Sequence, residues 1–302
     1  MKYSEKNKPL ICMQTTNRCY QTTRTFTPKG VLWHDTASDN PWLKRYVQPS
    51  DNAKDREEWL QLLGKNQYGN DWNHTDREAS MNCWIGKLAD GTVTTVQTMP
   101  WNYRPWGCGS GSKGSCNNTH IQFEICEDNL TDKAYFEAAY KEACEITAYL
   151  CKLYNIDPHG TTVTNGVTVP TILCHQDSYR YGLGSDHSDI YDWLPKYNKN
   201  METVRDDVAA LLNGTSNDAS TVIIGGKEVT VTLNQLKKGS SGTQVETLQA
   251  LLLNNGYKLP KYGADSDYGS ETETAVKQFQ KDNSLEADGI VGKNTWNKIL
   301  KG

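Results

Sequence analysis

A predicted strand and the helix that follows it constrain the fold most strongly. Residues 119–127 alternate in polarity, and one face of the strand carries Ile121, Phe123 and Ile125. The opposite face carries Glu124, which we expect to be solvated or to line a site. Residues 131–154 then place apolar side chains at helical spacing. A strand leading into a long amphipathic helix is typical of an α/β domain.

Further strands and helices alternate along the first two thirds of the chain. A strand that ends in His34 comes first, and an Asp-Gly turn joins two strands within 82–98 as a hairpin. A short buried strand is expected over 170–174. Helices are expected over 53–63 and 200–212. Together these elements predict a mixed sheet flanked by helices.

The length of 302 residues favours two domains. Residues 213–220 have the composition of a linker, which separates a first domain, 1–212, from a smaller one, 221–302. The smaller domain is predicted to be helical, and a Gly-x-x-Thr pattern at 269–272 and 292–295 precedes two of its helices. It contains no pair of titratable residues suited to catalysis, so we interpret it as a binding module.

Charge and hydropathy exclude several classes of partner. The net charge is −4 with no basic stripe, which argues against nucleic acid. No apolar run is long enough to span a bilayer, so no membrane partner is expected. The N-terminus lacks the apolar core of a signal peptide, so synthesis in the cytoplasm without export is expected. The sequence does not indicate an oligomeric state.

The cysteines are nine in number and contain no CxxC pair, which excludes a zinc ribbon. Without a secretion signal we expect most of them to be buried thiols. Cys12 with Cys19, and Cys108 with Cys116, remain as alternatives that could form bridges.

The densest group of metal-ligating residues follows the strand at 170–174. His175, His187 and Asp189 lie there, in a stretch expected to be a loop, and His34 ends another strand. Imidazole nitrogens and carboxylate oxygens are ordinary zinc ligands, so these positions predict a zinc site. The other histidines, which have polar neighbours, are expected at the surface or in supporting positions: His74, His120 and His159.

A zinc hydrolase also needs a base that steers the attacking water. Glu124 is the candidate because it lies in the middle of its strand on the polar face. Glu127 is the alternative, at the end of the same strand.

Three segments carry a family resemblance: 31–36 (VLWHDT), 121–127 (IQFEICE), and His175 with 187–189 (HSD). Over residues 8–212 the chain resembles the type 2, peptidoglycan-recognition-protein-like N-acetylmuramoyl-L-alanine amidases, including endolysins of clostridial phages. The resemblance implies an amidase type 2 fold and zinc bound by His34, His175 and Asp189. It also implies Glu124 as the catalytic acidic residue, and cleavage of the bond between the lactyl group and L-alanine in peptidoglycan.

One position departs from the family pattern. A Lys that stabilises the oxyanion often stands two residues before the last ligand, where this chain has His187. His187 either takes over that role or replaces Asp189 as the third ligand, and both alternatives stay open. The family's catalytic Tyr has no clear counterpart. Trp101 and Trp106, in the aromatic loop 100–111, are expected to line the substrate groove.

Residues 235–300 resemble the type 1 peptidoglycan-binding module, through the segments 236–242, 248–251 and 288–296. Both resemblances imply the same partner, bacterial peptidoglycan, and an endolysin or autolysin that acts at the cell wall after its release. Two other functions remain as alternatives. One is a non-catalytic peptidoglycan-recognition protein, and the other is a zinc peptidase of the stem peptide.

Overall fold

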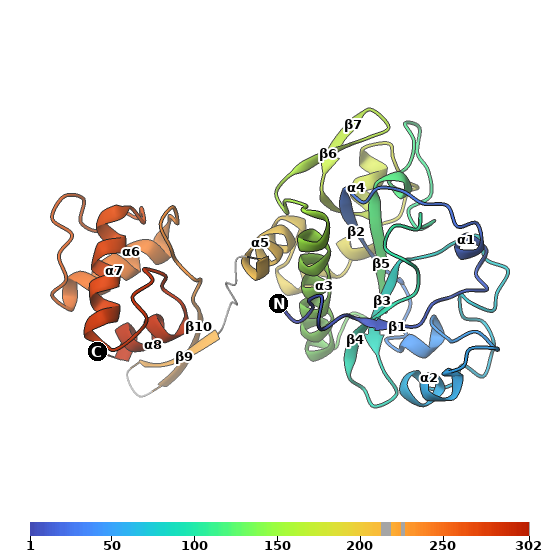
Figure 1. Cartoon of the computed structure of the whole chain (residues 1–302), viewed down its shortest axis with the longest axis horizontal. Coiled ribbons are helices and arrows are strands. Elements are labelled where there is room, and N and C mark those ends of the chain that lie inside the picture. Colours follow the sequence, from blue (N-terminus) through green and yellow to red (C-terminus); the bar gives the residue numbers. More distant parts are fainter. Residues whose placement is uncertain (213–218, 225–226, 302) are drawn as a thin grey trace. The chain divides into compact units, whose positions relative to one another are not determined.

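The computed structural model describes residues 1–212, 219–224 and 227–301 of the chain (Figure 1). The chain divides into two compact units, residues 1–212 and 213–302, here called unit 1 and unit 2. Most of the expected linker, residues 213–218, lies outside the described residues. Strand β9 (Ala219–Ile224) begins at the next position.

A mixed sheet organises unit 1, as the sequence predicts, with strand order β1-β4-β3-β5-β2-β8. Its strands are β1 (Leu10–Ile11), β2 (Gly30–Asp35), β3 (Cys83–Lys87), β4 (Val93–Gln97), β5 (His120–Ile125) and β8 (Ile172–Cys174). Strands β3, β5, β2 and β8 run parallel, and the β3–β4 hairpin supplies the antiparallel pair. A separate hairpin consists of β6 (Thr161–Thr164) and β7 (Val167–Pro170).

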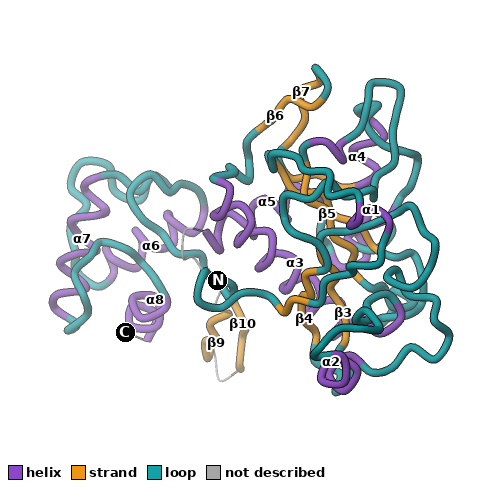
Figure 2. The backbone as a smooth tube through the Cα atoms, turned by 45° about the vertical axis from the view of Figure 1, so that its right-hand side comes forward, coloured by secondary structure: helices purple, strands orange, loops and turns teal. Residues whose placement is uncertain are grey.

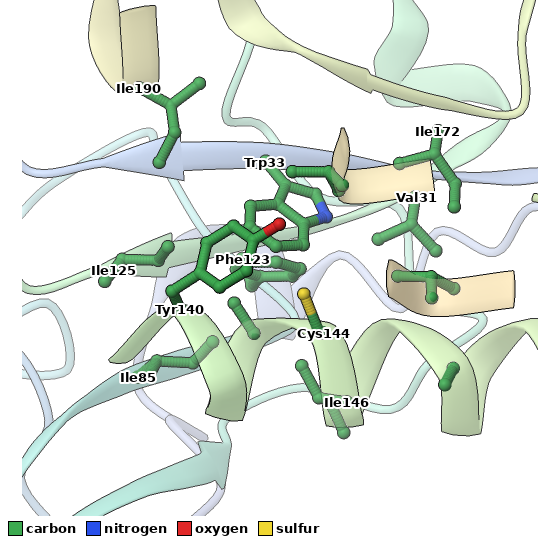
Figure 3. Close-up of a cluster of buried hydrophobic side chains, with 14 of the residues drawn as sticks. Val31, Trp33, Ile85, Phe123, Ile125, Tyr140, Cys144, Ile146, Ile172 and Ile190 are labelled. Carbon is green, nitrogen blue, oxygen red and sulfur yellow. The ribbon is translucent and has the colours of Figure 1, made fainter. Parts of the chain in front are cut away.

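Two long helices cover one face of this sheet, whereas mainly loops cover the other (Figures 1 and 2). The helices of unit 1 are α1 (Arg18–Gln21), α2 (Arg56–Leu63), α3 (Lys133–Tyr154), α4 (His175–Arg180) and α5 (Met201–Leu212). Helix α3 buries its apolar stripe against β2 and β5. Figure 3 shows Trp33 and Phe123 of the sheet facing Tyr140 and Cys144 of α3. The alternation in the β5 sequence correctly predicts this buried face.

The opposite face of the sheet carries the polar residues of the same strands. The register places His34 of β2 beside Glu124 of β5, and Gln122 lies on the same face two residues earlier. Small apolar clusters flank these residues on either side, one containing Trp84 of β3 and the other Leu173 of β8. We call His34, Gln122 and Glu124 the polar strip.

In unit 2, helices α6 (Thr243–Asn254), α7 (Ser270–Asp282) and α8 (Lys293–Lys301) enclose a separate core. Strands β9 and β10 (Lys227–Thr232) pair as an antiparallel hairpin. The sequence repeat has a structural counterpart. The Gln249 amide donates to Asp265 and Thr272, and the Gln280 amide donates to Asp288 and Thr295, each at 2.8–3.2 Å.

All nine cysteines are free thiols, and all are buried except the half-buried Cys19. The two alternative bridges, Cys12–Cys19 and Cys108–Cys116, are therefore not formed. Within the described part of the chain, no helix combines the length and apolar character needed to cross a lipid bilayer.

A surface position for His120 is contradicted, because this side chain is completely buried at the start of β5. The β6–β7 hairpin covers it. Its Nδ1 lies 2.9 Å from Thr119 Oγ1, which in turn contacts Thr164, and its Nε2 lies 3.3 Å from the Pro170 carbonyl. Burial lowers the pKa of His120 to about 4, which keeps its imidazole neutral in the folded protein.

We predict that His120 makes the stability of unit 1 depend on pH. Because its pKa is about 4 when folded and about 6.5 when unfolded, the unfolded state binds the extra proton. The free energy of unfolding should therefore fall as the pH drops through this interval, by about 3 kcal/mol in total. Urea unfolding at pH 7 and pH 4 would measure the change.

His120→Gln is the matched comparison, because every other titrating group is shared with the wild type. The variant should lose part of its stability at pH 7 and show the smaller decrease toward pH 4. An equal decrease in both proteins would assign the pH dependence to other groups.

Candidate functional site

Three potential metal ligands converge at the carboxyl ends of β2 and β8. His34 lies near the end of β2, His175 is the first residue of α4, and Asp189 opens the short 3₁₀ helix Asp189–Tyr191. The Nδ1 atoms of the two histidines are 3.1 Å apart, and Asp189 Oδ2 lies 2.9 Å from the first and 3.0 Å from the second. All three side chains are buried. Such a convergence of donor atoms around one point is suited to a divalent cation.

The segment after β8 is helical at its start, which corrects the expectation of a loop. His175 begins α4, whose N-cap is Cys174 and whose Asp177 lies in the first turn. Tyr191 donates a hydrogen bond of 2.9 Å to Asp177 and so ties the 3₁₀ helix to α4. Asp189 itself has a φ of 43°, in the left-handed region that few residues other than glycine adopt. Strained backbone of this kind concentrates at functional sites.

Buried polar groups fix the tautomer of His34. Its Nε2 lies 2.9 Å from Gln122 Oε1, which can only accept, so Nε2 carries the proton and Nδ1 keeps its lone pair. Gln122 is held in turn by Asn117, whose Oδ1 accepts from Gln122 Nε2 at 2.7 Å. This chain of bonds makes Nδ1 of His34 available as a ligand.

A second set of contacts orients His175. Its Nε2 lies 3.1 Å from Ser185 Oγ, and that hydroxyl lies 3.3 Å from the Cys108 carbonyl, to which it donates. The Ser185 oxygen can therefore accept a hydrogen bond from the Nε2–H of His175, which again leaves Nδ1 with its lone pair free. Both imidazoles thus present the same nitrogen to the same point.

None of the three supporting residues was predicted from the sequence. Gln122 has a recognisable pattern, because it shares the polar strand face with Glu124. Ser185 and Asn117 have none, since each reaches its partner from a loop or short 3₁₀ segment whose path the sequence does not specify.

Electrostatics support the same arrangement. Burial alone would raise the pKa of Asp189, but its close contacts with the imidazoles of His175 and His34 outweigh burial and lower it. The pKa of His175 is lowered, mainly by burial and against the effect of Asp189. The structure therefore favours an ionised carboxylate and a neutral imidazole, the forms in which these groups bind metals.

Glu124 lies beside the three ligands, opposite His34 in the strand register. It is buried, and its Oε2 has no hydrogen-bond partner in the described residues. Burial, together with the charges of Asp189 and Asp35, raises its pKa well above the usual range. A buried carboxyl group with one uncommitted oxygen is suited to moving a proton.

Two more carboxyl groups surround the site. The pKa of Asp35 is raised by burial and by the charges of Glu127 and Asp189, and the pKa of Glu127 is raised by burial. This concentration of buried carboxyl groups is unfavourable without a compensating positive charge. A divalent cation at the His34, His175 and Asp189 cluster would supply that charge.

His187 lies outside the ligand cluster. Its exposed ring stacks on His175 with the ring centres 4.6 Å apart, and its Nδ1 lies 3.2 Å from Ser185 Oγ. Of the two aromatic residues expected to line a groove, Trp106 is 41% exposed, whereas Trp101 packs partly buried against the core.

A second group of potential ligands lies exposed at the surface: His159, Glu202 and Asp206. The other two histidines do not join the His34 cluster, since His120 is buried elsewhere and His74 bonds to Asp71.

Comparison with known families gives two matches. Residues 24–196 match the family described as N-acetylmuramoyl-L-alanine amidase, and residues 241–299 match the putative peptidoglycan binding domain. The first match covers more than half of the chain.

Two curated relatives come from Bacillus licheniformis. The chain is 32% identical over 185 residues to a probable N-acetylmuramoyl-L-alanine amidase, a match covering 61% of this chain and 46% of the relative. It is 36% identical over 148 residues to N-acetylmuramoyl-L-alanine amidase CwlL, covering 45% and 39%. The chain thus matches less than half of the length of either relative.

Among solved structures, the catalytic domain of PlyG is 18% identical with a TM-score of 0.42, covering 67% of this chain and 94% of PlyG. A peptidoglycan-binding protein from Clostridioides difficile is 38% identical with a TM-score of 0.23, covering 28% of this chain and 55% of that protein.

We predict that Gln122→Leu weakens metal binding without removing a ligand. The substitution leaves Nε2 of His34 without its acceptor, so both the tautomer and the ring orientation lose their support. Loss of such a partner typically lowers metal affinity about 10- to 100-fold. Competition with a chromophoric chelator would measure it.

Gln97→Leu is the control, because Gln97 is a buried glutamine at a β4 position facing α3, away from the polar strip. It should cost stability but leave metal affinity unchanged. Equal metal affinity in the Gln122→Leu protein and the wild type would show that His34 needs no partner.

Proposed function

Because the chain belongs to the N-acetylmuramoyl-L-alanine amidase family, we propose that unit 1 is a zinc-dependent amidase of peptidoglycan. It hydrolyses the amide bond between the lactyl group of N-acetylmuramic acid and L-alanine. The observation that carries the proposal is the pairing of a three-ligand cluster with a buried, uncommitted Glu124 on the adjacent strand.

The donor set fits zinc. His34 Nδ1, His175 Nδ1 and Asp189 Oδ2 would hold the ion, which prefers nitrogen and carboxylate ligands and, in catalytic sites, has three from the protein. When bound, zinc acidifies a water molecule and polarises the substrate carbonyl. Gln122 and Ser185 keep both histidines in the tautomer that this role requires.

Glu124 is the proposed general base and acid. Its raised pKa brings proton uptake closer to neutral pH, and its unpartnered Oε2 is able to accept a proton from the attacking water. The same oxygen then delivers the proton to the nitrogen of the leaving L-alanine, so the carboxylate is restored at the end of each cycle. Glu127, the alternative base, lies beyond the end of β5, outside the strand register that places Glu124 beside His34.

His187 is the proposed donor to the oxyanion that forms on the lactyl carbonyl. Its ring lies against His175 at the exposed side of the cluster. Because Ser185 lies near its Nδ1, the Nε2 side of the ring can face substrate.

Unit 2 is the proposed wall-binding module, through residues 241–299. Attachment to the wall raises the local concentration of unit 1 near its substrate without adding catalytic contacts. The proposed place of action is the bacterial cell wall, which the protein reaches after release from the cell that makes it, as an endolysin or autolysin does.

We predict that two variants both lose hydrolysis but differ in whether they retain zinc. Glu124→Gln should retain zinc and lose about 10²- to 10⁴-fold in turnover, because only the proton carrier is lost. Asp189→Ala should lose zinc and activity together. Metal content by atomic absorption and release of new L-alanine amino termini from purified walls would measure both effects.

The new amino termini released from the wall also distinguish the amidase from the two alternative functions. An amidase frees peptides that begin with L-alanine and leaves the glycan strands intact, whereas a stem-peptide peptidase exposes other amino termini. If Asp189→Ala kept its zinc, His187 would be the third ligand. If zinc-loaded wild type bound walls but released no groups, the protein would be a recognition protein without catalysis.

A further inference from the structure

A pocket of about 580 Å³ lies in unit 2, at the start of α7. Its volume falls within the range of about 300–1,000 Å³ that is usual for sites of small ligands. An exposed tyrosine, a lysine and three carboxylates contribute to its lining: Tyr262, Lys261, Asp265, Asp267 and Glu271. We call it the Tyr262 pocket.

Tyr262 gives this pocket an aromatic surface. The residue is 60% exposed, although a large aromatic ring normally gains from burial. Its backbone is nevertheless held in place, because Glu271 accepts hydrogen bonds from the amides of Lys261 and Tyr262 at 2.7 and 3.1 Å. The Lys261 ammonium lies 4.7 Å from the ring centre. A positioned ring that stays open to solvent is suited to stacking on the apolar face of a flat ligand.

Hydrogen-bonding groups of both kinds surround the ring. One oxygen of Asp265 accepts from the Gln249 amide at 2.8 Å, which leaves its second oxygen for a ligand. The amides of Ser270 and Glu271 open α7, and the N-cap, Gly269, has no side chain to cap them. No protein acceptor in the described residues meets either amide. Free amides in the first turn of a helix are donors that a ligand carbonyl can satisfy.

Charge limits the ligands that this pocket can accept. Three carboxylates stand against one ammonium group, and the hydrogen bond from Gln249 lowers the pKa of Asp265. A ligand with free carboxylates of its own, such as a stem peptide, is therefore repelled. A neutral ligand with hydroxyl groups, an amide carbonyl and a flat apolar face fits all these features. N-acetylated sugars combine the three.

The second copy of the repeat forms a related pocket of about 350 Å³ at the start of α8. Asp288 takes the place of Asp265 there, and the spacing Asp-x-x-x-Gly-x-x-Thr is the same in both copies. Leu285, at the position equivalent to Tyr262, packs against the core of unit 2 instead. The shared polar framework thus belongs to the fold, and the exposed ring is what the first copy adds.

We propose that the Tyr262 pocket binds N-acetylated sugar units of a glycan strand, so that unit 2 attaches to the wall through its glycan and not through its peptides. This inference rests on the proposed function only in taking the cell wall as the source of the sugar. Tyr262 stacks on the sugar ring, and the carboxylates accept from its hydroxyl groups. The amides of Ser270 and Glu271 donate to the acetamido carbonyl.

Two neutral tetrasaccharides test the site by calorimetry with the full-length protein. Chitotetraose carries acetamido groups, and cellotetraose has hydroxyl groups in their place. Neither contains the bond between a lactyl group and L-alanine, so binding is measured without turnover. Chitotetraose should bind at least about tenfold more tightly, because its carbonyl groups satisfy the free helix amides. A free L-alanyl stem peptide, added to the complex, should not displace the sugar.

Variants at exposed tyrosines separate the stacking contact from a general effect. Tyr262→Ala should weaken chitotetraose binding about tenfold or more, because the apolar surface under the sugar is lost. Tyr262→Phe should retain most of the affinity, because the ring remains. Tyr68→Ala, at an 86% exposed tyrosine of unit 1, is the matched control and should change nothing. Thermal melting would establish that all three proteins are folded.

A second pair of variants separates the pocket from net charge. Asp267→Asn should weaken chitotetraose binding about threefold or more, because a charged acceptor is lost. Glu286→Gln removes an exposed carboxylate from the second pocket and should leave the affinity unchanged. Equal losses in the two variants would make net charge responsible and overturn the site.

The sugar site and the wall-binding role fail separately, because sedimentation with purified walls measures the role independently. A protein that sediments with walls, but whose affinity for chitotetraose is unchanged in Tyr262→Ala, would overturn the sugar site and keep the role. Tyr262-dependent binding of chitotetraose without sedimentation would support the site and overturn the role. Equal affinities for the two tetrasaccharides, or displacement by the stem peptide, would overturn the assignment to N-acetylated sugars.

Discussion

The placement of two imidazole nitrogens and one carboxylate oxygen within 3.1 Å of one another is the constraint on which unit 1 depends. Three electron-rich atoms at these distances repel one another, so the surrounding structure must hold them in place. The surrounding carboxyl groups, Asp35, Glu124 and Glu127, add to the cost. The parallel strands β2 and β8 make the arrangement possible, because their common register brings His34 and His175 to the same edge of the sheet.

The two faces of the sheet differ in their side chains and in what these side chains do. The α3 face is apolar and supplies the stability of unit 1, with Trp33 and Phe123 at its centre. The opposite face keeps a polar strip between two small apolar clusters, and polar residues of the loops complete it. Since the two faces share the same strands, a residue such as Glu124 is held rigidly by neighbours whose side chains never enter the site.

Strand periodicity explains how much of the site could be predicted. The period of two fixes the faces of β2 and β5, so His34 and Glu124 could be placed from sequence alone. The same rule failed for His120, because the polar face at the start of β5 is buried under a separate hairpin. The choice between His187 and Asp189 could not be made either. It depends on one left-handed residue and on the Tyr191–Asp177 bond, which no local pattern specifies.

The ligand cluster draws on distant parts of the chain, since 155 positions separate His34 from Asp189. During synthesis, β2 leaves the ribosome long before the segment that completes the cluster. The earlier residues therefore cannot form the three-ligand site on their own, and a nascent chain halted before Asp189 would offer only an incomplete set of donors. The complete ligand cluster therefore exists only after nearly all of unit 1 has been translated.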